Sequence, residues 1–446
     1  MSGPGQMKAP AVPGMAKRGA EAEERPKDWS WVEAVVWTER MVSALENGVK
    51  GGRWYSLMDK VYAPATLAAA WARVRAKGGA AGVDGLSIER FEARSERYLS
   101  ELAEALRSGT YEAQPVKRVE IPKGDGRTRP LGIPAVKDRI AQQAVKLVIE
   151  PIFEAKFRPE SYGFRPGRSC HDALREVDRL LKEGKAYVVD ADLAGYFDSI
   201  PHEPLMERVE EEISDGPLLG LVRGWLGQDV LRGMERWTPV SGTPQGAVIS
   251  PLLANIYLHP LDERMAALGY RMVRYADDFV VLCESREAAA AALAEIRRWV
   301  AENGLCLHPD KTHVGDWRVA GEGFEFLGYR FEAGRRWVRK KSLKRLKDGI
   351  RAKTKRTRGE SLSRIVADLN PMLRGWFGYF KHAHPFIFKR LDGFVRRRLR
   401  ALLRKQARRS GFGRCLADQM RWPNAFFAAA GLFALHAAWF EARHSR

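Results

Sequence analysis

Two adjacent acidic residues, Asp277 and Asp278, lie between two apolar runs in the segment RMVRYADDFVVLC (271–283). The apolar flanks predict two strands, with Ala276, Asp277 and Asp278 in the turn that joins them. A single Asp in a turn is ordinary, because its side chain bonds to the nearby backbone. Two neighbouring carboxylates repel each other unless a cation lies between them. The segment therefore predicts a short β-hairpin whose turn needs a positively charged partner.

A second acidic strand is predicted in the segment VVDADL (188–193). Asp190 and Asp192 are two residues apart, so their side chains point to the same face of a sheet. Carboxylates from two neighbouring strands form an all-oxygen site, which suits Mg²⁺. Two such ions, about 3.5–4 Å apart, stabilise both the attacking and the leaving oxygen in phosphoryl transfer. The two acidic segments therefore predict a site for two Mg²⁺ ions.

Positive charge is concentrated in the last quarter of the chain. The sequence carries a formal charge of +20, and residues 335–446 hold 30 Lys and Arg against 6 Asp and Glu. The preceding 334 residues hold 45 basic and 49 acidic residues. Such clustering is typical of proteins that bind nucleic acid. A solvated charged face is the alternative, but it would interleave acids, and residues 335–358 contain thirteen basic residues and one acid.

Length and composition bound the class of protein. At 446 residues the chain is too long for one hydrophobic core, so two or three domains are expected. No apolar stretch approaches the roughly 20 residues of a membrane helix, so no membrane is expected among the partners. Residues 1–28 are expected to form a disordered leader, because they are rich in Pro, Gly, Ala and charge. Four widely spaced cysteines predict neither disulfides nor a zinc site, which fits a reducing cytoplasmic setting. They are Cys170, Cys283, Cys306 and Cys415.

Strands and helices are mixed through most of the chain, which predicts an α+β core followed by an all-α basic domain. Residues 87–109 are expected to form one helix, with Ser87 as its N-cap and Gly109 at its end. The other expected elements are a hairpin over 116–134 turning at 123–126, a helix over 136–157, mostly helix over 203–233, a helix over 285–303 and a strand pair over 323–340.

Several blocks of the sequence, taken in order, carry a resemblance to a known family. They are YGFRPGRSCHDAL (162–174), DADLAGYFDSIPH (190–202), GTPQGAVISPLLANIYL (242–258), YADD (275–278), GLCLHPDKT (304–312), FEFLGYRF (324–331) and LRGWFGYFKHAHPFIFKRLD (373–392). Over roughly residues 50–446 the chain resembles the reverse transcriptases, or maturases, encoded by bacterial group II introns. A lone YADD would be weak support, whereas ordered blocks are highly specific.

The resemblance implies a right-hand polymerase fold with fingers and a palm built on a ferredoxin-like sheet. The expected parts are the leader 1–28, an N-terminal helical extension 29–110, fingers and palm 111–334, a thumb or maturase domain 335–410 and a short DNA- or RNA-binding segment 411–446. Many relatives continue into a cysteine-bearing H-N-H endonuclease module. This sequence shows no Cys/His array, so it resembles the endonuclease-lacking lineages, and cleavage of a second DNA strand is not expected.

Roles at the acidic site follow from matching the family's motifs. Asp192, Asp277 and Asp278 match the metal-binding triad, because Asp192 lies five residues before the motif's aromatic residue, Phe197. The resemblance implies that Phe197 lies under the incoming sugar and excludes a 2′-hydroxyl; plain core packing is the alternative. Lys311 matches the lysine that acts as general acid toward the leaving pyrophosphate, whereas its alternative is a solvated loop lysine.

Further residues are expected to hold the nucleotide and the nucleic acid. Arg127 and Arg129 are two apart in the predicted fingers hairpin, where guanidinium groups can grip a triphosphate; charges that protect a strand edge are the alternative. The other candidates come from the resemblance. Lys123 is expected to join Arg127 and Arg129 in binding dNTPs. Gln245 and Gly246 are expected to support the nucleotide and the template, and Arg165 and Arg168 are expected to contact the backbone of an RNA template or DNA primer.

The basic C-terminal region has two possible roles. It can be only a polymerase thumb, or it can also bind group II intron RNA and assist splicing, as the family does. Its aromatic run over 376–388 is expected to be helix core rather than a base-stacking platform. Seven arginines occupy too much of a helix circumference for one packed face, so RNA phosphate is their expected partner: Arg396, Arg397, Arg398, Arg400, Arg404, Arg408 and Arg409. The first four are the residues chosen as RNA contacts.

Three functions are compatible with the sequence. The first is a polymerase and maturase that supports intron mobility into target DNA. The second is an RNA-binding splicing factor without polymerase activity, which the intact acids at 192, 277 and 278 argue against. The third is a reverse transcriptase of host defence or DNA repair, outside any intron.

Overall fold

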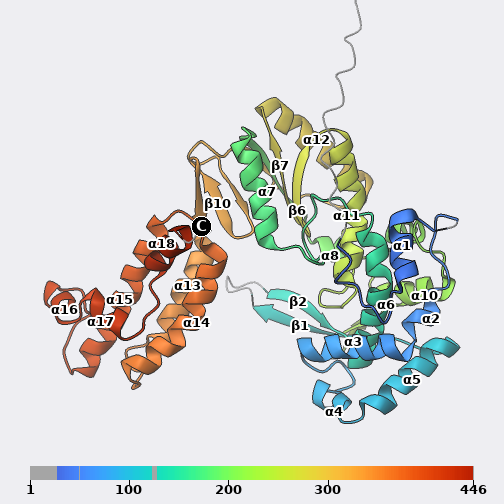
Figure 1. Ribbon diagram of the computed structural model, residues 1–446, viewed down its shortest axis with the longest axis horizontal. Helices are drawn as coiled ribbons and strands as arrows, with labels where there is room; N and C mark the ends of the chain where they lie inside the picture. Colours follow the sequence, from blue (N-terminus) through green and yellow to red (C-terminus); the bar gives the residue numbers. More distant parts are fainter. Residues whose placement is uncertain (1–27, 50, 123–127, 445–446) are drawn as a thin grey trace, which may run out of the picture.

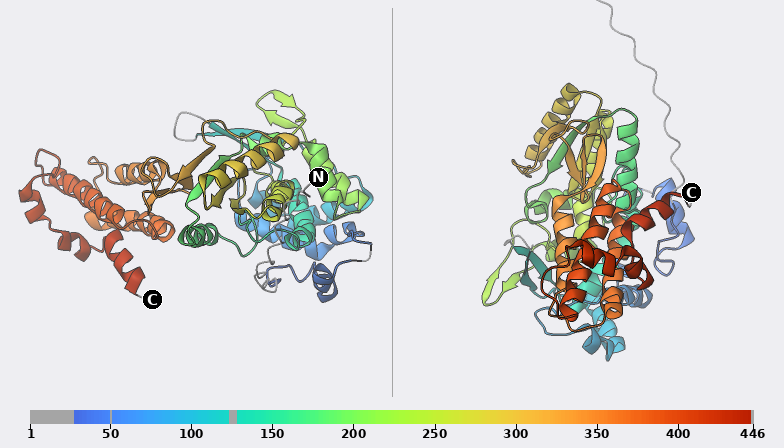
Figure 2. Two further views of the ribbon diagram at one scale, coloured as in Figure 1. Left: turned by 90° about the horizontal axis from the view of Figure 1, so that it is seen from above. Right: turned by 90° about the vertical axis from the view of Figure 1, so that its left-hand side faces the viewer.

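The structure is a computed structural model that describes residues 28–49, 51–122 and 128–444. The expected leader, apart from Asp28, and the candidates Lys123 and Arg127 lie outside these residues. Figure 1 shows an elongated molecule, with the C-terminal helices at one end and the N-terminal helices at the other, and the left view of Figure 2 agrees. Within the described ranges, no helix combines the length and the apolar character needed to cross a membrane.

The N-terminal part is helical, as expected. Its helices are α1 (Glu39–Asn47), α2 (Met58–Val61), α3 (Pro64–Lys77), α4 (Ile88–Glu92) and α5 (Ser95–Ser108), and α3 and α5 pack against α6 (Val136–Glu154). The prediction of one helix over 87–109 is wrong, because the helix is interrupted between Glu92 and Ser95. The predicted ends are confirmed: the Ser87 side chain accepts from the Arg90 amide, and Gly109 has a left-handed φ of 72°. The break leaves the core stripe intact, since the rings of Phe91 and Tyr98 lie 5.1 Å apart.

The fingers sheet has the strand order β2-β1-β4-β5. Its strands are β1 (Val116–Pro122), β2 (Thr128–Ile133), β4 (Val230–Arg232) and β5 (Glu235–Trp237). The predicted hairpin is confirmed, with Pro122 opposite Thr128 in antiparallel register. Mostly helix was expected over 203–233; α9 (His202–Glu210) and α10 (Gly216–Leu226) are helical, but β4 ends this stretch as a strand paired with β1.

The palm is a four-stranded antiparallel sheet in the order β6-β7-β3-β8. The strands are β3 (Tyr187–Asp192), β6 (Arg271–Tyr275), β7 (Asp278–Cys283) and β8 (His313–Asp316), and α11 (Ser250–Ala267) and α12 (Arg286–Glu302) lie between them in the chain. A β-α-β-β-α-β chain in this order is the ferredoxin-like arrangement. The expected palm topology is therefore confirmed.

Strand β7 separates two hydrophobic cores. Phe279 and Val281 belong to the core shared with the N-terminal helices, whereas Val280 and Leu282 belong to the core shared with the C-terminal helices. Both faces of the strand are thus buried, which explains why the sequence after Asp278 is continuously apolar rather than alternating. The palm sheet is the structural link between the two ends of the molecule.

A third sheet joins the palm to the C-terminal helices. The expected strand pair over 323–340 is three antiparallel strands, β9 (Phe324–Phe326), β10 (Tyr329–Glu332) and β11 (Arg335–Val338). The expected domain boundary between 334 and 335 falls inside the β10–β11 hairpin, so the all-helical part begins at Lys340. Its helices are α13 (Lys340–Lys353), α14 (Leu362–Phe380), α15 (Phe386–Gln406), α16 (Leu416–Arg421), α17 (Asn424–Ala429) and α18 (Leu435–His444).

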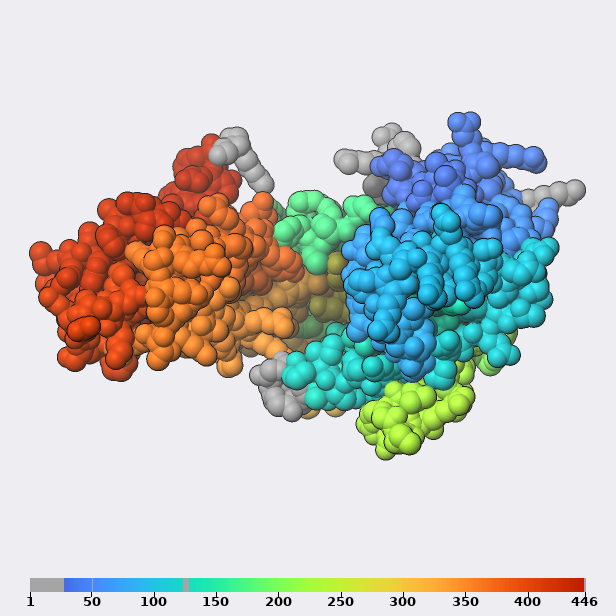
Figure 3. All heavy atoms as spheres, turned by 90° about the horizontal axis from the view of Figure 1, so that it is seen from below, coloured from blue at the N-terminus to red at the C-terminus, as the bar shows by residue number. Residues whose placement is uncertain are grey.

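The aromatic run of α14 and α15 is mostly core, as predicted. Phe377, Phe380 and Phe388 are buried, whereas Phe386 is 52% exposed. In the space-filling view of Figure 3, the face is hollowed between the N-terminal and C-terminal helices, with palm residues at the base of the hollow. The fold thus leaves the palm accessible between two helical parts.

Candidate active site

The strand register brings the predicted acids together. Asp192 is the last residue of β3 and lies directly opposite Asp278, the first residue of β7. The turn is shorter than expected: it contains Ala276 and Asp277, and Asp278 already pairs with Tyr275 in the sheet. Ala276 adopts a left-handed φ of 60°, which is uncommon for a residue with a side chain. Three carboxylates therefore meet at one end of the palm sheet.

Burial and mutual repulsion disfavour the charged forms of these acids. The pKa of Asp278 is raised to about 7, first by burial and then by the charges of Asp190 and Asp277. The pKa of Asp277 is also raised, by burial and by Asp192, although Arg129 and Arg274 oppose this effect. Burial likewise raises the pKa of Asp190 to about 6. A cation at this end of the sheet would relieve the repulsion.

Lys311 lies beside the acids, where the sequence predicted it. Its ammonium donates to Asp192 Oδ2 at 2.7 Å, and its chain segment is fixed by a bond of 2.7 Å from the His308 amide to the Asp192 carbonyl oxygen. The Lys311 side chain is 52% exposed, so it is a solvent-facing loop lysine that is also paired with Asp192. Within the described residues, no group of three or more His, Cys, Asp or Glu side chains is already arranged so that it could hold a metal ion. The Lys311 ammonium is the cation that bonds directly to Asp192.

A cavity of about 640 Å³ lies between the fingers hairpin and the palm. Its lining includes Arg129 from β2, Phe197 from α8 (Tyr196–Ser199), Phe164, Gln245 and Gly246. Four of these five residues are predicted from the sequence as nucleotide contacts: Arg129, Phe197, Gln245 and Gly246. Phe197 is 9% exposed and its ring meets the edge of Phe164, with centroids 6.4 Å apart, so it is packed and also faces the cavity.

Hydrogen bonds tie the fingers to the palm across this cavity. Arg129 Nε donates to Gln245 Oε1 at 2.8 Å, and Gln245 Nε2 donates to Asp198 Oδ2 at 3.3 Å. Gly246 has a φ of 115°, and a Cβ there would lie 2.3 Å from the carbonyl oxygen of Gly132 in β2. Only glycine lets this loop approach the hairpin so closely. Gln245 and Gly246 thus shape the cavity, beyond forming a turn.

The prediction that Arg165 contacts nucleic acid is wrong. Its guanidinium is buried and pairs with Glu154 at 2.7 Å, and it also donates to the Ser161 carbonyl oxygen at 2.7 Å. The Arg165 guanidinium thus donates its hydrogen bonds to a carboxylate and to the backbone of the loop after α6. Arg168 donates to the Pro159 carbonyl oxygen at 2.6 Å and lies over the Tyr162 ring, but it stays partly exposed. Its contact with template or primer stays a prediction.

A buried ion pair that the sequence did not predict holds the turn before Asp277. Arg274 of β6 is fully buried and donates from Nε to Asp262 Oδ1 at 2.7 Å. Its Nη1 donates to Asn255 Oδ1 at 2.9 Å and to the Ala276 carbonyl oxygen at 3.0 Å. The Ala276 carbonyl belongs to the peptide that enters Asp277. Arg274 therefore fixes the backbone that presents the acids.

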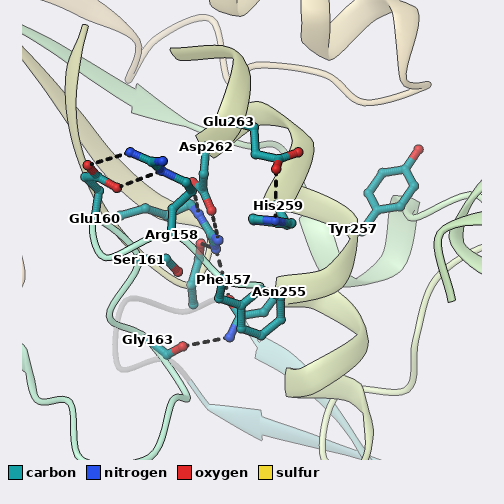
Figure 4. A network of polar contacts seen from close by, with 12 residues as sticks. Phe157, Arg158, Glu160, Ser161, Gly163, Asn255, Tyr257, His259, Asp262 and Glu263 are labelled. Carbon is teal, nitrogen blue, oxygen red and sulfur yellow. Dashed lines mark hydrogen bonds and ion pairs between the residues drawn. The ribbon is translucent and has the colours of Figure 1, made fainter. Parts of the chain in front are cut away.

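Figure 4 shows that Asp262 and Asn255 extend from one helix, α11, and that Asn255 reaches the backbone of Gly163. The Asn255 amide donates to the Gly163 carbonyl oxygen at 2.8 Å, and a Cβ at Gly163 would lie 2.2 Å from the Ala276 nitrogen. The sequence carried one signal for this network. Arg274 is a charged residue within the apolar flank of the acidic hairpin, and burial of such a charge requires a partner.

Arg274→Met is expected to leave Asp262 as an uncompensated buried charge and to lower the free energy of unfolding by about 3–5 kcal/mol. The double variant Arg274→Met/Asp262→Leu removes both charges and is expected to recover much of that stability. Chemical denaturation of the three proteins measures both effects. Primer extension by the double variant is expected to stay low, because the Ala276 carbonyl has lost its donor. Full activity of the double variant would show that the network does not position the acids.

Two of the four arginines expected to meet phosphate form hydrogen bonds within the protein. Arg400 is buried and donates to the Trp422 carbonyl oxygen at 2.9 Å. Arg398 is partly exposed and donates to the Thr354 Oγ1 at 3.0 Å and to the Thr354 carbonyl oxygen at 2.7 Å. These bonds join α15 to the segments after α13 and α16, and the prediction of phosphate contact is wrong for the buried Arg400. Arg396 is half-buried and Arg397 is exposed, and for them it stays a prediction.

A basic groove of about 410 Å³ lies between α13 and α15. Three cations surround one ring in it: Lys347, Arg351 and Arg397 lie 5.9, 5.5 and 5.5 Å from the centroid of Phe394. Arg351 is also paired with Asp348. The cations of two helices therefore gather on one face of the C-terminal part.

Comparison with known families agrees with this geometry. The profile of the reverse transcriptase (RNA-dependent DNA polymerase) family matches residues 121–331, and that of the group II intron maturase-specific domain matches residues 343–420. The palm sheet and its acids thus define a reverse transcriptase, an RNA-directed DNA polymerase. More particularly, the chain belongs to the group II intron reverse transcriptases and maturases.

Similar proteins come from bacteria and from yeasts, where they are described as intron proteins. Protein YkfC of Escherichia coli strain K12 is 37% identical, with 56% of this chain and 75% of YkfC covered. The group II intron-encoded protein LtrA of Lactococcus lactis subsp. cremoris is 38% identical, with 44% and 32% covered, so the match spans about a third of LtrA. A chain of the partial Cas6-RT-Cas1–Cas2 complex is 26% identical over 55% of this chain, with a TM-score of 0.36.

Proposed function

We propose that Asp192, Asp277 and Asp278 hold two Mg²⁺ ions for DNA synthesis on an RNA template, and that the C-terminal helices bind group II intron RNA to assist splicing. The observation that carries the first part is the β3–β7 register, which sets Asp192 opposite Asp278 with Asp277 in the adjoining turn. Reverse transcription of the intron RNA at target DNA would then support intron mobility. A reverse transcriptase acting outside an intron is the other candidate.

The donor set fits magnesium. All three candidate ligands are carboxylates, which Mg²⁺ prefers, and burial followed by the charge of neighbouring carboxylates raises the pKa values of Asp277 and Asp278. When bound, the two ions would supply charge stabilisation for phosphoryl transfer. Lys311 keeps an ammonium beside Asp192, so it is suited to give a proton to the leaving pyrophosphate. Arg129 presents its guanidinium at the cavity edge for a triphosphate.

Asp277→Asn is expected to lower primer extension on an RNA template by about 100-fold or more, because bound metal supplies several kcal/mol of transition-state stabilisation. RNA binding is expected to stay close to wild type, since the acids lie far from the basic helices in the sequence and the fold. The matched control is Asp190→Asn. Asp190 lies on the same face of β3 as Asp192, and this variant is expected to retain most of the activity. Primer extension and filter binding measure both properties. Wild-type extension by Asp277→Asn would overturn the metal assignment.

Phe197→Ala is expected to increase the use of ribonucleotides relative to deoxynucleotides by roughly 10–200-fold, the range for discrimination by pocket shape. The ring faces the cavity beside Gln245 and Gly246, where a 2′-hydroxyl would need its space. Phe164→Ala, which shortens the neighbouring ring, is the matched control and is expected to keep the discrimination. Single-nucleotide incorporation kinetics give the ratio. Unchanged selectivity with lowered stability would make Phe197 core packing alone.

The C-terminal helices offer a matched pair of charge deletions. Arg396→Gln/Arg397→Gln is expected to flatten the log–log salt dependence of intron RNA binding by about 1.4–1.8, because each phosphate contact contributes roughly 0.7–0.9. Arg398→Gln/Arg400→Gln removes the same charge from internal hydrogen bonds, so it is expected to lower stability and leave the slope nearly unchanged. Salt titration and denaturation of both variants provide the measurements. Equal slopes for the two variants would contradict the assignment.

Extension of a short preformed duplex separates a thumb from a maturase. If the helices bind intron RNA as proposed, Arg396→Gln/Arg397→Gln weakens intron binding and splicing more than it weakens nucleotide addition. Equal losses in both assays would indicate a thumb alone.

A further inference from the structure

A second basic cavity, of about 810 Å³, lies away from the acids, where the C-terminal helices meet the palm. Its walls come from α7 (Cys170–Lys182), the β10–β11 hairpin, the connection between α14 and α15, and α18. Its volume is within the range of small-molecule sites, about 300–1,000 Å³. The functions proposed above leave this cavity without a role.

The lining carries more positive than negative charge. Asp178 is the acid that lines the cavity among the described residues, and it pairs with Arg336 and, at 3.2 Å, with Lys182. Three further cations, Arg335, Lys381 and Arg443, line the same cavity and are exposed. They come from β11, the α14–α15 connection and α18. An anion is therefore the ligand whose charge complements these walls.

Aromatic surface and an unused polar atom accompany this charge. The half-buried indoles of Trp317 and Trp439 both line the cavity, and Arg443 lies 4.6 Å from the ring centroid of Trp439. His384 also lines it, and within the described part of the chain its buried Nδ1 has no hydrogen-bond partner. A buried polar atom without a partner is unusual in a native fold and is satisfied by a bound group.

We propose that this cavity binds a single unpaired nucleotide of an RNA strand, with its base against the indoles and its phosphate between Arg335, Lys381 and Arg443. Single-stranded nucleic acid is held by aromatic rings that stack on bases and by cations that follow the backbone, and both are present here. The inference rests on the proposed RNA binding and gives it a particular site.

Paired RNA and other anions are disfavoured by the shape of this surface. The cavity is a recess between elements from five parts of the chain, including the β8–β9 connection that carries Trp317, whereas a duplex keeps its bases stacked inside. A free nucleotide shares the chemistry of a strand nucleotide, so the experiment must separate these two sources.

The test is photocrosslinking of the full-length protein to a short single-stranded RNA that contains 4-thiouridine, with the attachment sites mapped by mass spectrometry. Crosslinks are expected in peptides that contain Trp317, His384 or Trp439. Trp439→Leu is expected to reduce them by about fivefold or more, the loss of one base–aromatic contact. The triple variant Arg335→Gln/Lys381→Gln/Arg443→Gln is expected to do the same.

The control removes equal charge elsewhere: Arg40→Gln/Arg90→Gln/Arg94→Gln changes three exposed arginines of the N-terminal helices and is expected to keep the crosslinks. Equal crosslinking by a perfectly paired hairpin, or stronger protection of the cavity by AMP than by the RNA strand, would overturn the proposal. Absence of crosslinks in these peptides from a protein that binds RNA and extends primers would overturn this inference alone. Failure of RNA binding itself would instead overturn the proposed function.

Discussion

The buried pair of Arg274 and Asp262 is the interaction on which the active site depends. It places a full charge in the interior, where only a bonded partner makes such a charge tolerable. The same guanidinium bonds to the Ala276 carbonyl oxygen, one residue before Asp277. The Arg274 guanidinium thus holds this strained turn, beside which the three carboxylates meet, from the protein interior. The solvent side of the acids is left to other cations.

Two hydrophobic cores, one on each side of β7, connect the active site to the rest of the molecule. One core reaches the N-terminal helices and the other reaches α14 and α15, so the acids lie at the end of a sheet whose strands β3, β6 and β7 contribute to both cores. Arg129 and Gln245 add a polar link from the fingers to the palm above the cavity. The basic C-terminal helices are therefore built onto the same sheet that presents the acids, which is how one chain can hold RNA and act on it.

Sequence patterns predicted what depends on local chemistry. Alternation and charge identified the acidic strands, and the resemblance assigned Lys311 and Asp192 to one active site, where the structure pairs them, and Phe197 and Gln245 to the nucleotide, where both line one cavity. Whether an arginine side chain is exposed or buried could not be predicted from such patterns. Arg397 and Arg400 are three residues apart in one helix, yet one is exposed and the other is buried under Trp422, because a distant segment folds over it. Arg165 and Arg274 were misjudged or missed for the same reason: their partners are set by tertiary packing.

The central claim is that the carboxylates held by this turn bind the metal ions of polymerisation. The most direct measurement is anomalous diffraction from crystals of the protein with Mn²⁺, an RNA template, a DNA primer and a nucleotide that cannot react. Two manganese peaks are expected between Asp192, Asp277 and Asp278, with the Lys311 ammonium displaced from Asp192. Manganese bound elsewhere, with Lys311 still on Asp192 and a nucleotide seated in the cavity, would contradict the account.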